Sequence, residues 1–194
     1  GIAPQRTNKR MVLCDLGGRG HPLVLQSHLD TLGAMVRSIK DTGRLRFSKI
    51  GGSPDAYIVT ENCLVHTMGG ASYTGTIQPV DPAAHVNRSI RDLKPEEESL
   101  EVVLDEDVPS RAQAEALGIS AGDFISFDPR TVVTGTGYIK SRHLDDKASA
   151  AVLLSLASLV AEQRLRPARR VYLLFTTYEE VGHGASAGLP VDVE

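Results

Sequence analysis

Residues 171–180 read VYLLFTTYEE, an apolar run that ends at a pair of glutamates. Such continuous apolar character is typical of a strand that is buried on both faces of a parallel or mixed sheet. Upstream, residues 145–164 are rich in Ala and Leu and contain no Gly or Pro, which predicts a helix of about five turns. A helix followed by a buried strand is half of a βαβ unit. This stretch therefore predicts an α/β fold.

Two more apolar runs, at residues 11–16 and 22–27, lie near the start of the chain and predict two further strands of the same sheet. The pattern then changes to short segments with β character, separated by glycine-containing turns. These segments are residues 34–39, 45–50, 57–59, 63–67, 73–80, 100–104, 123–127 and 131–134, with a short helix at 110–118. Closely spaced short strands are typical of a small barrel or sandwich.

The predicted organisation is nested. We expect a mixed sheet flanked by helices, built from residues 1–35 and 130–194, to form a discontinuous α/β domain. We expect residues 36–129 to form an inserted β-rich, barrel-like domain.

Composition excludes several classes of function. Of the 194 residues, 41% are hydrophobic and 23% are charged, and the net charge is −3, which gives no indication of a nucleic-acid groove or an anionic membrane partner. Aromatic residues make up only 5% and Trp is absent, which argues against base stacking. The apolar stretch 148–160 is too short to span a bilayer. The first residues lack the apolar core of a signal peptide, and Cys14 and Cys63 fit two reduced thiols, so we expect a cytoplasmic protein.

Three short clusters contain the candidate chemistry: residues 27–30 (SHLD), 143–146 (HLDD) and 178–182 (YEEVG). Two of them follow predicted strands and the third opens the predicted helix. Open α/β sheets bind their ligands beyond the carboxyl ends of the strands, so we expect the clusters to lie close together. His, Asp and Glu side chains at such an edge suit a hydrolytic site with one or two divalent metal ions.

Each cluster alone also has a simpler interpretation. His28 and Asp30 share one face of an extended segment, where the carboxylate can fix the tautomer of a metal-binding imidazole, but they also fit a polar turn. Asp145 and Asp146 fit either a helix cap or a carboxylate that bridges two metal ions. The adjacent glutamates repel each other, so they require either a cation or a solvated loop.

The ordered set of clusters resembles the M42 family of metallo-aminopeptidases, the glutamyl-aminopeptidase and tetrahedral-aminopeptidase group. The matching stretches are residues 27–33 (SHLDTLG), 142–147 (RHLDDK) and 177–182 (TYEEVG), and the predicted insert lies where this family has its inserted domain. The resemblance implies a zinc-peptidase-like α/β domain, hydrolysis of N-terminal residues from peptides by a water that two metal ions activate, and self-association through the insert.

The resemblance also implies a role for each site residue. His28 would bind one metal ion, Asp145 would bridge two and Glu180 would bind the second, with Zn²⁺ or Co²⁺ as the metal. Glu179 would be the general base, and Asp30 would orient His28.

The sequence departs from the family pattern in two places. Only His183 separates Gly182 from Gly184, where the family usually has two residues. The family also has a further acidic ligand and a His downstream, which would lie beyond Glu194, and the chain does not begin with Met. We therefore expect this sequence to be part of a longer enzyme.

Two alternatives remain open at this point. An M20-type deacylase or carboxypeptidase also has His-x-Asp and Glu-Glu, but its extra domain normally follows the glutamates, whereas here the predicted insert precedes Asp145. A non-catalytic assembly protein could keep the same fold without holding metal.

Overall fold

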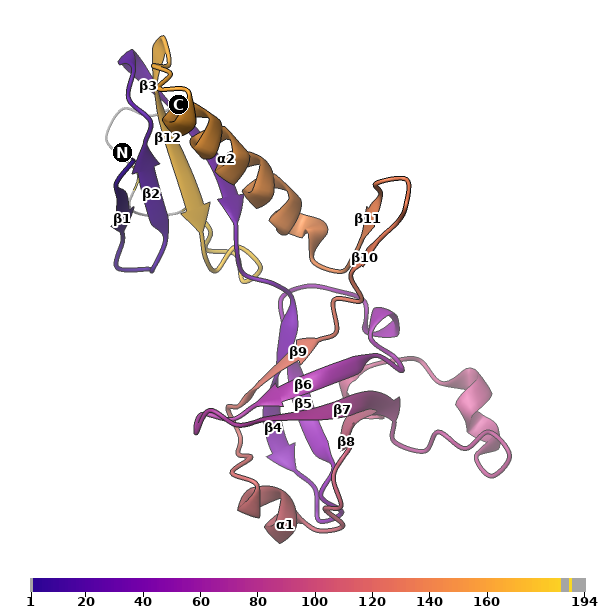
Figure 1. The fold of residues 1–194 in the computed structure, drawn as a ribbon. Helices are drawn as coiled ribbons and strands as arrows, with labels where there is room; N and C mark the ends of the chain where they lie inside the picture. The colour runs from indigo at the N-terminus through magenta and orange to yellow at the C-terminus, as the bar shows by residue number, and fades with distance from the viewer. Residues whose placement is uncertain (1, 186–188, 190–194) are drawn as a thin grey trace. The chain divides into compact units, whose positions relative to one another are not determined.

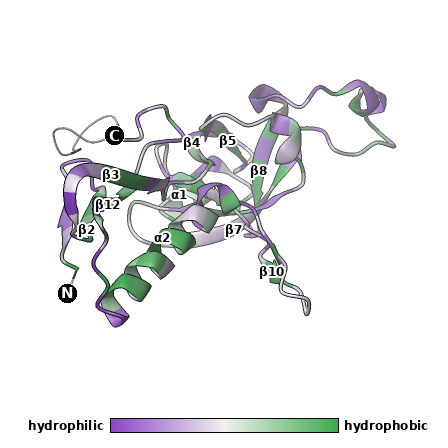
Figure 2. Ribbon diagram, turned by 90° about the horizontal axis from the view of Figure 1, so that it is seen from above, coloured by the Kyte–Doolittle hydropathy of each residue, from purple (hydrophilic) through white to green (hydrophobic). Residues whose placement is uncertain are grey.

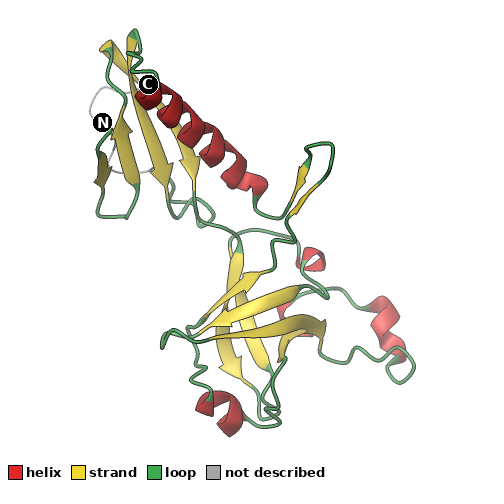
Figure 3. Cartoon of the chain, in the orientation of Figure 1, coloured by secondary structure: helices red, strands yellow, loops and turns green. Residues whose placement is uncertain are grey.

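The chain forms two compact units in a computed structural model that describes residues 2–185 and 189. The first unit combines Gly1–Thr31 with Thr131–Glu194, and the second consists of Leu32–Arg130 (Figure 1). Helices are few, and strands are the more numerous regular elements in both units (Figure 3). The roles that the sequence assigned to the two parts remain predictions.

A four-stranded mixed sheet forms the centre of the first unit. The strands are β1 (Pro4–Arg6), β2 (Val12–Asp15), β12 (Arg169–Thr176) and β3 (Arg19–His28), in that spatial order. The β1–β2 and β2–β12 pairs are antiparallel, whereas β12 and β3 run parallel. Five consecutive residues of β12 are buried, as expected for the apolar run at 171–176. The mixed sheet agrees with the predicted fold class, although the short edge strand β1 was not predicted.

Helix α2 (Leu144–Glu162) packs on this sheet. Its buried residues Ala150, Leu153 and Val160 share a core with Leu173 and Phe175 of β12. Other apolar residues of α2 flank this buried stripe and are exposed, with Val152 66% and Leu154 57% accessible. Figure 2 shows hydrophobic residues along much of this helix.

The start of the predicted helix needs a correction. Asp145 and Asp146 have non-helical backbone angles and are joined by a cis peptide bond, and the N-cap is His143 in a left-handed conformation. Ahead of the helix, a small hairpin of β10 (Val132–Val133) and β11 (Ile139–Lys140) belongs to the first unit rather than to the β-rich block.

The second unit contains a closed barrel with the strand order β4-β5-β8-β7-β6-β9. These strands are β4 (Gly33–Ile39), β5 (Leu45–Ile50), β6 (Asn62–His66), β7 (Ser72–Pro79), β8 (Leu100–Leu104) and β9 (Phe124–Phe127). Phe47, Leu45, Val65, Ile77 and Val102 are fully buried in its core. Closure pairs the strands around the barrel, which leaves few unpaired edge groups.

The connections of the barrel are short helical segments: α1 (Arg111–Ala116) and the 3-10 turns η1 (Asp55–Tyr57), η2 (Arg88–Asp92) and η3 (Glu97–Ser99). The predicted strand at 57–59 is wrong, because Pro54 precedes a 3-10 turn at this position and Ile58 closes it. Ser110 caps α1, and its hydroxyl accepts a hydrogen bond from the Gln113 N–H.

The barrel wall contains a buried carboxylate that is paired with two cations. Glu101 of β8 is fully buried and pairs with Lys40 at 2.7 Å and with Arg44. A buried carboxylate is costly without such partners, so the two cations compensate for its loss of hydration.

Within the described residues, no helix combines the length and the apolar character needed to cross a membrane.

Candidate metal and active site

The site lies at the edge of the first unit's sheet where two parallel strands end together. His28 is the last residue of β3 and Thr176 is the last residue of β12, and the two are direct partners in the parallel register. The Leu29 N–H continues the pairing by donating to the Thr176 carbonyl at 2.9 Å. The segments that follow the two strands therefore start side by side, so the first and third sequence clusters meet here.

The second cluster reaches the same place from the start of α2. The His28 main-chain N–H donates to the Asp146 carboxylate at 3.3 Å, and the Lys147 ammonium donates to the Leu29 carbonyl. No side-chain cap hydrogen bond is present at this helix start, so capping does not explain the two aspartates. Asp146 lies inside the 143–146 cluster but was not among the predicted site residues, so its contact with His28 is a new feature of the site.

His28 is buried, and its two ring nitrogens face different acceptors. Nδ1 lies 3.0 Å from the Asp30 carbonyl oxygen, and Nε2 lies 2.9 Å from Asp145 Oδ1 and 3.8 Å from Glu179 Oε2. A carbonyl only accepts, so Nδ1 holds a proton. In the neutral ring, Nε2 then directs its lone pair toward the carboxylates, which is the arrangement of a metal-binding imidazole.

Electrostatics favour a positive charge at this position. Burial lowers the pKa of His28, but the hydrogen bonds to Asp145 and Asp30 and the nearby charges of Asp30 and Glu179 raise it further than burial lowers it. In the absence of another cation, the nearby carboxylates thus favour the protonated form of the His28 imidazole.

Asp30 makes contacts that differ from the predicted one. The sequence suggested that its carboxylate orients His28, but the hydrogen bond to Nδ1 comes from the Asp30 main chain, and Oδ1 lies 3.7 Å from Nδ1. Oδ2 instead accepts from the Glu180 N–H at 3.0 Å, and Oδ1 is buried without a hydrogen-bond partner. Asp30 therefore joins the segment after β3 to the segment after β12.

The paired glutamates lie in a tight turn after β12. The Gly182 N–H donates to the Glu179 carbonyl at 2.8 Å, and the His183 N–H donates to the Tyr178 carbonyl at 2.9 Å. Gly182 has a φ of +81°, a conformation that favours glycine, and Tyr178 has a φ of 64°. His183 is thus part of this turn through its main chain, and its side chain is exposed.

The two glutamates differ in environment. The Glu179 side chain is 55% exposed, whereas Glu180 is partly buried. Burial raises the pKa of the Glu180 carboxyl; His28 opposes this rise, and the charges of Asp145, Glu179 and Asp30 add to it. One glutamate is therefore accessible to solvent, and the other sits among like charges that a cation would offset.

The side chains at this site are chemically suited to bind a divalent metal ion. An imidazole nitrogen and several carboxylates, with an orphaned buried oxygen on Asp30, are the groups that bind Zn²⁺ and similar ions. Within the described part of the chain, however, no three His, Cys, Asp or Glu side chains already surround a common point suitable for a metal. Asp192 and Glu194, which follow the glutamates in sequence, lie outside the described residues.

Two further histidines lie in the second unit. His66 belongs to the barrel, where its ring nitrogens contact the hydroxyls of Ser72 at 3.0 Å and Ser126 at 2.7 Å. His85 is exposed on a loop of the second unit. Of the predicted site residues, the structure brings His28, Asp30, Asp145, Glu179 and Glu180 together at one edge of the sheet.

Comparison with known proteins gives a consistent result. The family model of the M42 glutamyl aminopeptidases matches residues 11–194. The chain is 41% identical to the protein YhfE of Bacillus subtilis (strain 168) over 187 residues, which are 95% of this chain and 54% of that protein.

Solved structures show the same fold. Aminopeptidase APDkam598 from the archaeon Desulfurococcus kamchatkensis is 26% identical, with a TM-score of 0.79 over 93% of this chain and 47% of that one. The TET1 peptidase of Pyrococcus horikoshii, which can assemble into a tetrahedron or a large octahedral shell, has a TM-score of 0.80 at 24% identity over 93% of this chain and 52% of that one. The chain spans about half the length of the curated relatives it matches.

Loss of the Asp30 carboxylate is expected to loosen the glutamate turn. Asp30→Ala removes the acceptor of the Glu180 N–H, and a hydrogen bond to a charged group contributes about 1.5–3 kcal/mol. We expect faster amide exchange in residues 178–184, measured by hydrogen–deuterium exchange with mass spectrometry. Asp41→Ala, on the exposed surface of the second unit, is the control. Unchanged exchange at the turn would show that Asp30 does not hold it.

Proposed function

Because the chain belongs to the M42 family of glutamyl aminopeptidases, we propose that it is part of a metal-dependent aminopeptidase that removes N-terminal residues from peptides. The observation that supports this most directly is the contact of His28 Nε2 with Asp145 and Glu179 at the sheet edge. His28 is more than 100 positions from both acids in sequence, so the fold brings it to them.

His28, Asp145 and Glu180 are the proposed metal ligands. The lone pair of His28 Nε2, the exposed carboxylate of Asp145 and the raised pKa of Glu180 all support a cation among them. A carboxylate has two oxygens, so Asp145 can serve two metal ions of the Zn²⁺ or Co²⁺ type. When bound, such ions act as Lewis acids that polarise the scissile carbonyl and lower the pKa of a water molecule.

Glu179 is the proposed general base. Its side chain is half exposed and lies within 3.8 Å of His28 Nε2, so it can reach a water molecule beside the ligands. It would take a proton from the attacking water and pass it to the leaving amine. Asp30 would act as a positioning residue, since it holds the main chain of Glu180 and, through its own carbonyl, the ring of His28.

We also propose that the protein self-associates through the barrel unit. Its strands form a closed body separate from the sheet, and the TET1 peptidase with the same fold assembles into large shells. Sedimentation velocity of the purified protein tests this proposal. We expect a discrete species of at least two chains, and a monomer at micromolar concentration would contradict it.

Replacement of the proposed base should separate catalysis from metal binding. We expect Glu179→Gln to lower the hydrolysis of aminoacyl p-nitroanilides by about 10²–10⁴-fold, because proton transfer by a positioned side chain contributes that much. Metal content should stay unchanged. Glu162→Gln, an exposed residue at the end of α2, is the matched control. Appreciable activity of Glu179→Gln would rule out this residue as the base, and hydrolysis of N-acyl amino acids instead of the anilides would favour a deacylase.

Metal content gives a second, independent test. We expect the purified protein to retain Zn²⁺ or Co²⁺ after dialysis and to lose it with a chelator, as measured by elemental analysis. His28→Ala removes a proposed ligand of one of the two metal ions, so we expect the metal content per chain to fall by at least half. The control His85→Ala, in the second unit, should leave the metal content unchanged. If the unmodified protein retains no metal after loading, the non-catalytic assembly role is the better interpretation.

A further inference from the structure

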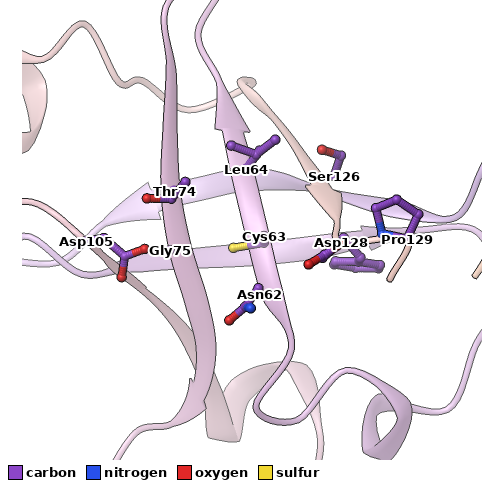
Figure 4. Close-up of a pocket in the computed structure, with 10 residues that line it drawn as sticks. Asn62, Cys63, Leu64, Thr74, Gly75, Asp105, Ser126, Asp128 and Pro129 are labelled. Atoms are coloured by element: carbon purple, nitrogen blue, oxygen red, sulfur yellow. The ribbon is translucent and has the colours of Figure 1, made fainter. Parts of the chain in front are cut away.

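A hollow of about 410 Å³ opens in the wall of the barrel, within the second unit (Figure 4). Its lining residues come from strands β6, β7 and β9 and from the segments that follow β8 and β9. All of them belong to the described part of the chain. Small-molecule sites typically have volumes of about 300–1,000 Å³, so this hollow is large enough for a small ligand.

The strand register defines the wall. Leu64 of β6 lies between Thr74 of β7 and Ser126 of β9, and in the next row Cys63 lies between Gly75 and Phe127. The hollow is therefore bounded by a continuous three-stranded patch with hydroxyl groups on both sides of an apolar centre.

Two carboxylates border the hollow and are anchored to this patch through the main chain. Asp105, just after β8, donates its N–H to the Thr74 carbonyl at 3.0 Å, and Asp128, just after β9, donates its N–H to the Asn62 carbonyl at 2.9 Å. Figure 4 shows the two side chains on opposite sides of the β6 strand at Cys63. The acids thus have defined positions in the wall.

No cationic side chain of the described residues neutralises these acids. The lining contains no Lys, Arg or His, and neither aspartate forms an ion pair with the residues that the structure describes. Asp128 accepts a hydrogen bond from the Arg130 N–H at 2.9 Å, whereas the Asp105 carboxylate has no hydrogen bond within the described chain. The hollow is therefore negative in charge.

Cys63 adds a buried group without a charge. Its side chain is only 3% exposed, and its sulfur lies on the side of β6 that faces Gly75 (Figure 4). Burial, with smaller effects from Asp105 and Glu61, raises the pKa of Cys63 to about 12. The thiol is therefore protonated at neutral pH, and the carboxylates are the only charges in the lining.

We propose that this hollow binds an aliphatic ammonium group, with one or both aspartates contacting the cation and with Leu64 and Pro129 contacting the methylene chain. The two carboxylates would repel an anion, and a purely apolar ligand would displace water from the half-buried Asp128 without replacing its hydrogen bonds. The amide of Asn62 and the hydroxyl of Thr74 supply further acceptors for an ammonium, which has three donors. The cation is either a free amine or a lysine side chain. This site is independent of the proposed peptidase chemistry, since it lies in the other unit.

Matched ligands of equal length test the proposal. We expect 1,5-diaminopentane to shift backbone NMR resonances of β6, β7 and β9 with a Kd on the order of 1 mM, as is reasonable for a small ligand. 1,5-Pentanediol and glutarate, which have the same chain length but neutral or negative ends, should not bind. Nα-acetyl-lysine N-methylamide shows the source of the cation: tighter binding than the diamine indicates a lysine side chain, and weaker binding indicates a free amine.

Variants of the aspartates provide the control. Asp105→Asn and Asp128→Asn keep the shape and the main-chain hydrogen bonds, so we expect each to weaken binding of 1,5-diaminopentane about threefold to fivefold, the range for a partly exposed ion pair. Asp107→Asn, in the same acidic segment but outside this hollow, should have no effect. The NMR spectrum of each free variant reports whether it is folded. The proposal is wrong if the diamine produces no shifts at about 20 mM, if the diol binds equally well, or if Asp107→Asn weakens binding as much as the other two.

Discussion

The site depends on the parallel pairing of β3 with β12. Because Thr176 and His28 are partners in the register, both strands end at the same level, and a shift of one residue would turn the His28 side chain to the other face of the sheet. The pairing is specified by burial: β12 has five consecutive buried residues, which fixes its place between β2 and β3. The contacts among His28, Asp145 and Glu179 then follow from the geometry of the sheet edge.

The acidic residues at this edge oppose folding unless something compensates for their charge. Three kinds of contact do so within the described chain. Main-chain N–H groups donate to Asp30 and Asp146, the imidazole contacts Asp145, and solvent reaches the half-exposed Glu179. Glu180 benefits least, because it is partly buried among the other carboxylates and its pKa is raised. This imbalance is the physical reason to expect a cation at the site.

Sequence patterns predicted the parts of the structure that depend on local periodicity. The apolar run at 171–176 is β12, and the three clusters meet as expected from two positions after strands and one at the start of the helix. The patterns failed where the local backbone departed from the regular geometry. Pro54 starts a 3-10 turn where a strand was expected, and the distorted backbone at Asp145 and Asp146 delays the regular helix. The contacts of Asp30 could not be predicted either, because periodicity places a side chain on a face but does not say whether its carboxylate or its carbonyl meets the imidazole.

The same electrostatic argument applies to two places that share no residues. At the sheet edge, carboxylates converge on an imidazole; in the barrel, Asp105 and Asp128 border a hollow with no cation in its lining. Glu101 differs from these residues, since it is fully buried and paired with Lys40 and Arg44. The aspartates of the hollow lack such partners although their main chains are held in the wall. Asp105 is exposed and Asp128 is half-buried, so a cation from solvent can reach both carboxylates without breaking an existing ion pair.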